Sequence, residues 1–186
     1  MTSSFREHFK AHQAAVEKSI DVLEAATNLA ARALAGALTT GNKVLTFGNG
    51  GSSAEASHLA EELVGKFRKT RRPFPAISLS SDAATATCIS NDFGYETLFE
   101  RQIEAFVQPG DVAVALTTSG KSENVIRGLR AAKSRGAVTI ALTGSAGLKG
   151  IDADHILAVP SDDSALVQEV HIVLIHLFCM AVDDIG

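Results

Sequence analysis

The chain is poor in the residues that mark several protein classes. Its 186 residues include two cysteines, four prolines, one tyrosine and no tryptophan. Two cysteines far apart in sequence, Cys88 and Cys179, cannot supply the disulfide framework of a small secreted domain. We therefore expect free thiols in a reducing compartment. The chain also lacks a linker, an internal repeat or a low-complexity segment, which excludes a solenoid or a multidomain array.

An excess of positive charge is missing as well. The net charge is -4 and the sequence pI is about 5.8. A weakly acidic chain has no global attraction for nucleic acid or for an anionic membrane. One local basic run covers residues 66–72. We interpret it as a solvated helix end and loop, where Lys and Arg are favoured; an anion contact or a partner surface is the alternative.

Targeting and membrane signals are absent from the sequence pattern. Residues 1–8 do not show a charged and then apolar signal pattern. The longest apolar stretch, residues 172–182, is interrupted by His176 and is too short to span a bilayer. These observations predict a soluble cytoplasmic protein without a membrane partner.

What the chain does have is an alternation of helical and strand patterns. With 46% hydrophobic residues, it suits one compact domain over residues 1–186. Apolar residues at helical spacing predict a long first helix over about residues 4–38. The predicted strands after it cover residues 43–47, 75–79, 111–116, 137–142 and 155–159. The predicted helices between and after them cover residues 53–67, 82–90, 96–106, 122–135 and 164–184.

Strands that are apolar throughout and alternate with helices indicate a parallel sheet covered on both faces. The predicted fold class is therefore α/β, a doubly wound three-layer αβα sandwich. The first helix carries more apolar positions than one narrow contact requires. We expect it to bury surface in an oligomer; the alternative is that it packs only on its own sheet.

Two loops follow predicted strands at the edge where open α/β sheets bind ligands. The first contains Asn49, Gly50, Gly51 and Ser52. It is not a dinucleotide fingerprint, because Ser53 stands where the third Gly or Ala is needed. Its glycines still allow a ligand to approach the backbone, and Ser supplies a hydroxyl or a helix cap.

The second loop contains Thr117, Thr118, Ser119 and Ser122. A P-loop is excluded because Ala115 stands where its first glycine would be. Hydroxyls and backbone N–H groups at a helix N-terminus suit a phosphate group. Ordinary capping of the helix by Ser119 or Ser122 is the alternative.

A third break in the pattern contains Asn91 and Asp92. Both residue types favour turns, so a plain turn is one interpretation. Hydrogen bonding to substrate hydroxyls is the other.

Four side chains near the two ends of the chain could form a metal or acid–base site. His58 and Glu62 are four residues apart and share one helical face, and Gln168 and His176 are eight apart on the last helix. Individually, His58 could be an ordinary polar residue and Glu62, beside Glu61, a surface charge. His176 lies within an apolar run, where burial is costly without a partner, and this favours a functional role.

The remaining histidines give less information. His171 either contributes to this site or makes a core contact. No convergent partner is visible for three others, which we expect to be structural: His8, His12 and His155.

Taken together, four segments resemble the phosphoheptose isomerases of the sugar isomerase (SIS) superfamily. The segments are Gly48-Asn49-Gly50-Gly51-Ser52 followed by His58-x-x-x-Glu62; Asn91-Asp92-Phe93-Gly94-Tyr95-Glu96; Thr117-Thr118-Ser119-Gly120-Lys121-Ser122-Glu123-Asn124; and Gln168-Glu169-Val170-His171 with His176. The resemblance covers residues 5–184, and its specificity lies in the combination. One departure is Thr117, where many relatives have Ser; the hydroxyl is kept.

The resemblance implies a flavodoxin-like SIS fold and a homotetramer with active sites shared between subunits. It implies conversion of sedoheptulose 7-phosphate to D-glycero-D-manno-heptose 7-phosphate, the first step toward nucleotide-activated heptose for lipopolysaccharide, capsule or S-layer glycans. Glu62 and His176 match the acid–base pair. One Zn²⁺ per subunit would be held by His58, Glu62, Gln168 and His176. The substrate contacts would be Asn49, Gly50, Gly51, Ser52, Asn91, Asp92, Thr117, Thr118, Ser119, Ser122 and Gln168.

Two other functions stay open on this superfamily's scaffold. One is a non-catalytic SIS protein that binds a sugar phosphate or a protein partner such as a replication initiator. The other is an isomerase for a different phosphosugar. Because Glu62 and His176 are both present, we favour the enzyme.

Overall fold

The computed structural model describes residues 4–186. Its centre is one five-stranded sheet with all neighbouring strands parallel, in the order β2-β1-β3-β4-β5. This is the strand order of doubly wound flavodoxin-like folds. The strands are β1 (Val44–Gly48), β2 (Ala76–Ser78), β3 (Val112–Thr117), β4 (Val138–Thr143) and β5 (His155–Ala158). The predicted sandwich around a parallel sheet is confirmed.

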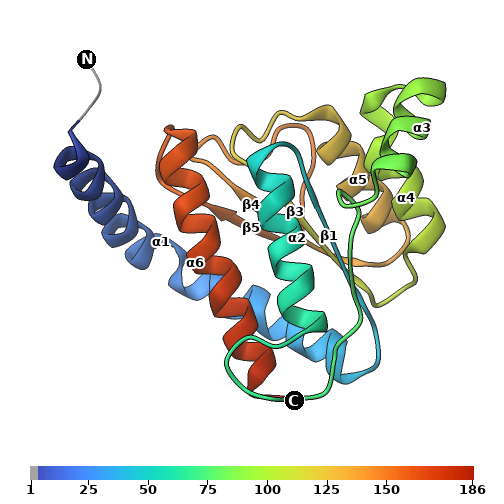
Figure 1. Cartoon of the computed structure of the whole chain (residues 1–186), viewed down its shortest axis with the longest axis horizontal. Helices are drawn as coiled ribbons and strands as arrows, with labels where there is room; N and C mark the ends of the chain where they lie inside the picture. The colour runs from blue at the N-terminus through green and yellow to red at the C-terminus, as the bar shows by residue number, and fades with distance from the viewer. Residues whose placement is uncertain (1–3) are drawn as a thin grey trace.

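Helices cover both faces of this sheet. The helices of one layer are α1 (Phe5–Thr39), α2 (Gly51–Val64) and α6 (Ser164–Asp183). Those of the other layer are α3 (Ala83–Phe93), α4 (Leu98–Phe106) and α5 (Glu123–Ser134), with the short 3-10 turn η1 (Tyr95–Thr97) before α4. Figure 1 shows α2 and α6 side by side on one face, with α3, α4 and α5 on the other side of the sheet, at the right of the view.

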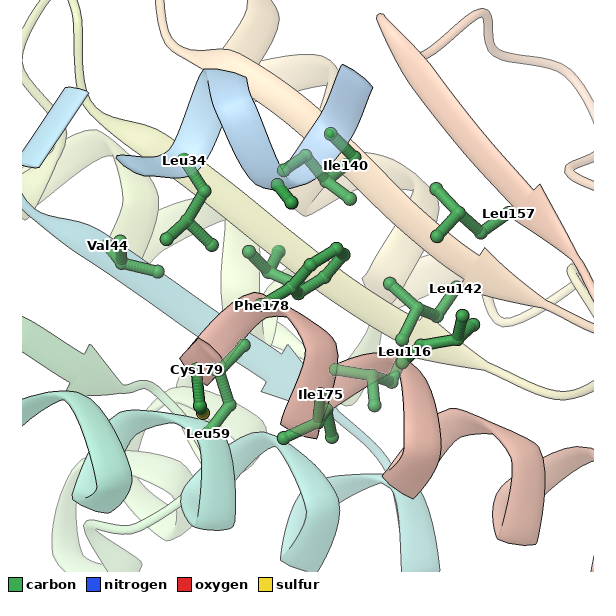
Figure 2. Packing of buried hydrophobic residues seen from close by; sticks show 14 of the residues in the cluster. Leu34, Val44, Leu59, Leu116, Ile140, Leu142, Leu157, Ile175, Phe178 and Cys179 are labelled. Carbon is green, nitrogen blue, oxygen red and sulfur yellow. The ribbon is translucent and has the colours of Figure 1, made fainter. Parts of the chain in front are cut away.

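Each face of the sheet buries its own hydrophobic core because side chains alternate along a strand. On β3, Val112, Val114 and Leu116 point to the α1/α2/α6 layer, whereas Ala113 and Ala115 point to the other. Figure 2 shows the first core, where side chains of the three helices meet side chains of the strands. This core fixes α2 and α6 against the sheet and against each other, and both helices carry candidate site residues.

The last helix is the most apolar one. By length and composition α6 is able to cross a membrane, and 44% of its apolar window is buried inside the molecule. Its buried residues, among them Ile175, Phe178 and Cys179, form part of the core in Figure 2. The helix is therefore a core element here.

The predicted break around residues 91–94 is wrong in its position. Asp82 caps α3 by accepting a hydrogen bond from the Ala84 N–H, and the helix continues through Asn91 and Asp92. It ends at Gly94, whose φ of +89° suits glycine. The turn propensity of Asn and Asp was outweighed by a well-capped helix.

The solvated interpretation of the basic run fails for one residue. The Arg71 side chain is 1% exposed, and its Nε lies 3.0 Å from the Asp183 Oδ1 of a side chain that is 3% exposed. The Arg68 and Lys69 N–H groups also donate to Asp183, at 2.9 and 3.0 Å. These bonds hold the loop after α2 against the C-terminal end of α6. Lys66, in contrast, is exposed.

Candidate active site

Two helices begin at the carboxyl ends of neighbouring strands, α2 after β1 and α5 after β3. Their N-caps are Gly50 and Ser122, and neither makes a side-chain capping bond within the described chain. In the first turn of α5 the Val125 N–H donates to the Asn124 side-chain oxygen at 2.9 Å, and each helix presents the positive end of its dipole at its start. Such a pair of N-termini suits an anion.

A polar pocket lies between these helix starts. It has a volume of about 160 Å³ and is lined by Asn49, Ser52, Leu116, Thr117, Thr118, Ser119, Ser122 and Gln168. All of these residues except Leu116 belong to the predicted substrate site. Gly51 adjoins the pocket: a Cβ on it would come within 2.4 Å of Gln168 Nε2, so glycine allows the close approach of α6.

The hydroxyl groups of the loop at residues 117–122 do not cap helix α5. Ser119 Oγ accepts a hydrogen bond from the Lys121 N–H at 3.2 Å, and Ser122 Oγ lies 3.4 Å from Thr117 Oγ1. The proposed capping role for Ser122 is wrong, because its side chain makes no cap bond. These hydroxyls can still donate to a ligand.

One wall of the pocket is held by residues that sequence analysis missed. The Asn49 and Asn124 amides exchange two hydrogen bonds of 2.9 Å, and the Tyr95 hydroxyl donates to Asn49 Oδ1 at 2.7 Å. Asn91 and Asp92 are not in this wall; they lie exposed on α3, where the Asn91 amide donates to Asp92 at 2.7 Å. Their contact with substrate stays a prediction.

The second centre is a His–Glu–His cluster formed by His58 and Glu62 of α2 and His176 of α6. One potential ligand atom from each residue lies within 4.8 Å of the others. The two Nε2 atoms of His58 and His176 are 3.2 Å apart, and His58 Nε2 is 3.8 Å from Glu62 Oε1. All three are partly buried. Two imidazoles and a carboxylate at these separations can hold a metal ion or move protons.

Glu61, which sequence analysis treated as a surface neighbour, orients His58. Its Oε1 lies 3.0 Å from His58 Nδ1. A carboxylate at this distance favours the tautomer with the proton on Nδ1, so the Nε2 lone pair faces the cluster. The same pattern supports metal-binding histidines in other proteins.

The loop after α2 contributes an aromatic cover. The ring of Phe67 stacks on His176 with centroids 5.0 Å apart and an interplanar angle of 29°. The Arg68 guanidinium lies 5.1 Å from the centroid of Phe67. Stacking restricts the orientation of the imidazole.

Cys179 lies one turn after His176 but is not a candidate nucleophile. Burial, followed by the negative charge of Glu62, raises the pKa of its thiol to about 12. It remains protonated at neutral pH and packs as part of the core.

Two of the remaining histidines differ from expectation. His8 Nε2 and His12 Nδ1 each lie 2.7 Å from an oxygen of Glu169 on α6. The absence of a convergent partner, inferred from sequence, is therefore wrong for both residues. His171 is fully buried, 3.3 Å from the Thr143 carbonyl and 3.7 Å from Glu55.

Comparison with known proteins identifies the family. The SIS domain profile matches residues 7–144. A phosphoheptose isomerase of Aquifex aeolicus is 55% identical over 152 residues, covering 81% of this chain and 80% of that protein. That of Aliarcobacter butzleri is 40% identical over 185 residues, covering 99% and 98%. This chain belongs to the phosphoheptose isomerase family.

Solved structures agree with this assignment. A phosphoheptose isomerase from Francisella tularensis superposes with a TM-score of 0.92 at 35% identity, and one from Neisseria gonorrhoeae with 0.88 at 37%. Each comparison covers 96% of both chains. The flavodoxin-like SIS fold is confirmed, and the chain is an isomerase. The relatives favour this function over a binding-only SIS protein.

Proposed function

We propose that the enzyme converts sedoheptulose 7-phosphate to D-glycero-D-manno-heptose 7-phosphate. The observation that carries this proposal is the presence of two different centres along one pair of helices. Ser52 lines the polar pocket, and His58 lies six residues further along α2, or about 9 Å at the rise of an α-helix. A sugar phosphate with its anion in the pocket would extend its other end toward the cluster.

The polar pocket suits the phosphate group. The starts of α2 and α5 and the hydroxyls of Thr117, Ser119 and Ser122 offer donors without a basic side chain in the lining. Backbone N–H groups and hydroxyls bind phosphate with little reorganisation. Asn91 and Asp92 stay proposed contacts to the substrate hydroxyls.

The cluster suits the proton transfers. Ketose–aldose isomerisation removes a proton from C1 and returns it to C2 through an enediol. We assign the transfer at carbon to Glu62, whose side chain is 15% exposed. We assign exchange of protons with the O1 and O2 oxygens to His176. One carboxylate and one imidazole are sufficient for both transfers, and no net oxidation occurs.

The donor set also fits zinc. Tetrahedral zinc with Zn–N bonds of about 2.0–2.1 Å needs ligand atoms roughly 3.3 Å apart; the His58 and His176 Nε2 atoms are 3.2 Å apart. We propose that His58, Glu62, Gln168 and His176 hold one Zn²⁺ per subunit. A bound zinc supplies polarisation of the sugar oxygens. Gln168 is the unusual ligand of the four, because zinc prefers nitrogen, sulfur and carboxylate oxygen.

A homotetramer is the proposed assembly. α1 and α6 enclose an apolar groove of about 300 Å³, and its walls include Val16, Ile20, Leu23, Val173 and Leu177. Phe5 and Phe9 near the start of α1 are 80% and 58% exposed. Burial of such surface against further copies of the chain would be favourable. The resemblance adds that the active sites are shared between subunits.

The proposed setting is the cytoplasm, with a small sugar phosphate as the partner and neither nucleic acid nor a membrane. The product would enter nucleotide-activated heptose synthesis for a surface glycan.

The test is incubation of the purified enzyme with sedoheptulose 7-phosphate, with and without added Zn²⁺, followed by NMR. We expect the heptose aldose signals to grow until equilibrium. A Glu62→Gln variant serves as the matched control. No conversion under either condition would overturn the proposal in favour of a binding protein. Conversion only of a different ketose phosphate would retain the chemistry and replace the substrate.

A further inference from the structure

A second titratable pair lies between α2 and α6. These helices run side by side (Figure 1) and contact each other along their length. Gly51 meets Gln168 at one end of the interface, and His58 meets His176 further along. Glu55 and His171 occupy the turn between these two contacts. Neither residue belongs to the acid–base or metal assignments above.

Both side chains are buried. The His171 side chain is 0% exposed and the Glu55 side chain 8%. Over residues 4–186, His171 Nδ1 and Glu55 Oε2 are two of the few buried polar atoms without a hydrogen-bond partner. They face each other at 3.7 Å. Burying unpaired polar atoms costs free energy, so two such atoms that face each other require an explanation.

The contact of the other ring nitrogen, Nε2, determines where His171 carries its proton. His171 Nε2 lies 3.3 Å from the Thr143 carbonyl oxygen. A carbonyl only accepts hydrogen bonds, so Nε2 must carry a proton. In a neutral imidazole, Nδ1 is then an acceptor and would face another acceptor, the Glu55 carboxylate. This repulsion disappears when one further proton lies between the two atoms.

We propose that Glu55 and His171 bind one additional proton together, held on His171 Nδ1, and act as a positioning pair that fixes α2 against α6. The proton is assigned to the ring because imidazole holds a proton more tightly than a carboxylate does. A shift of about 0.8–1 Å would close the 3.7 Å separation to a charge-assisted hydrogen bond. No bond other than this hydrogen bond forms or breaks.

The consequence for the site is geometric. The pair lies between the residues of the polar pocket and those of the His–Glu–His cluster on the same two helices. Holding the helices together at this turn keeps Ser52 and His58 of α2 in fixed positions relative to α6. The role in catalysis rests on the proposed function, whereas the shared proton does not.

Neutron diffraction from crystals of the whole enzyme at about pD 8 tests the shared proton directly. Free histidine is neutral at this pD. We expect deuterium on both ring nitrogens of His171 in the wild type. In Glu55→Gln the amide can donate to Nδ1, so we expect deuterium on Nε2 alone. A wild-type ring without deuterium on Nδ1 would overturn the proposal, whether or not the enzyme is active.

Thermal unfolding of the variants tests the positioning role. Glu55→Gln keeps a hydrogen bond, and we expect its Tm within about 3 °C of the wild type. Glu55→Leu leaves His171 unpaired and should lower Tm by on the order of 10 °C. In the folded variants, we expect kcat to fall at least tenfold in Glu55→Leu and less than threefold in Glu55→Gln, with KM little changed. Equal kcat in both would contradict a positioning role.

Discussion

The two centres of the site are built in different ways. The polar pocket uses the ends of backbone elements, with the starts of α2 and α5 and short hydroxyl side chains. The His–Glu–His cluster uses long side chains projecting from the middle of α2 and α6. Backbone donors are supplied by many residues at once, whereas each side chain of the cluster has a separate task. We therefore expect substitutions in the pocket to weaken binding gradually and those in the cluster to stop turnover.

The largest expected effect is the loss of turnover in Glu62→Gln. Removing a general base costs about 10²–10⁴-fold in rate, so we expect kcat to fall by about 10³-fold. The measurement is initial velocity by NMR or a coupled assay. Glu61→Gln is a matched control on the same helix, since its amide oxygen can still accept from His58 Nδ1. A Glu62→Gln rate near that of the control would disprove the assignment.

A smaller effect, on stability, is expected at the ion pair between Asp183 and Arg71. Asp183 is paired with buried Arg71. Burial raises the pKa of Asp183, but hydrogen bonds from the Arg68 and Lys69 N–H groups and the Arg71 charge outweigh burial and lower the pKa below its usual range. Asp183→Asn leaves the Arg71 charge unpaired and should reduce the free energy of unfolding by about 3 kcal/mol at neutral pH.

The pH dependence of this loss has a defined sign. A carboxyl group with a lowered pKa in the folded state stabilises the fold above its unfolded pKa, and this contribution disappears as the pH falls through the folded pKa. Denaturant unfolding from pH 7 down to about pH 3 should show the gap between wild type and Asp183→Asn narrowing on the acid side. A constant gap across this range would argue against the ionised pair.

In the pocket, Ser122→Ala should raise KM rather than lower kcat. A hydrogen bond to a charged group contributes about 1.5–3 kcal/mol, so we expect KM to rise about tenfold. The Ser134 hydroxyl, at the opposite end of α5, donates to the Ala131 carbonyl. Ser134→Ala is therefore the matched control, and steady-state kinetics is the measurement. A loss of kcat without a change in KM would contradict the proposal that the pocket binds the phosphate and the cluster moves the protons.

The smallest effect is expected at the aromatic cover of His176. Loss of the stack in Phe67→Leu should remove about 1 kcal/mol and lower kcat roughly fivefold, because the imidazole is less well oriented. Phe67→Tyr should restore it. Phe106→Leu, at a residue that is 45% exposed on α4, controls for the general loss of an aromatic ring. Equal kcat in Phe67→Leu and wild type would show that the stack does not orient His176.

Much of this fold could be predicted because buried parallel strands have a simple pattern. The strand expected over residues 111–116 is β3, Val112–Thr117, and the last helix was expected at 164–184 and runs Ser164–Asp183. The loops of the pocket were also accessible, since glycine and hydroxyl residues directly follow apolar strands. Asn91 and Asp92 were misjudged because local turn propensity was given more weight than the Asp82 cap.

Contacts between distant segments could not be predicted from sequence. The His8 and His12 bonds to Glu169 join residues 161 and 157 positions apart. The Phe67 stack depends on the path of the loop that Asp183 fastens to α6. Glu55 and His171 likewise meet only because α2 and α6 pack side by side. No periodicity or short motif specifies such pairs.

The central claim is that one centre binds the phosphate and the other moves the protons. The most direct measurement is titration calorimetry of Glu62→Gln with sedoheptulose 7-phosphate in the presence of Zn²⁺. Because the polar pocket is intact in this variant, we predict a Kd within about threefold of that of the matched Glu61→Gln control. Competition by inorganic phosphate in the same titrations confirms that the sugar phosphate binds in the polar pocket. A loss of binding as large as the loss of turnover would contradict the separation of the two centres.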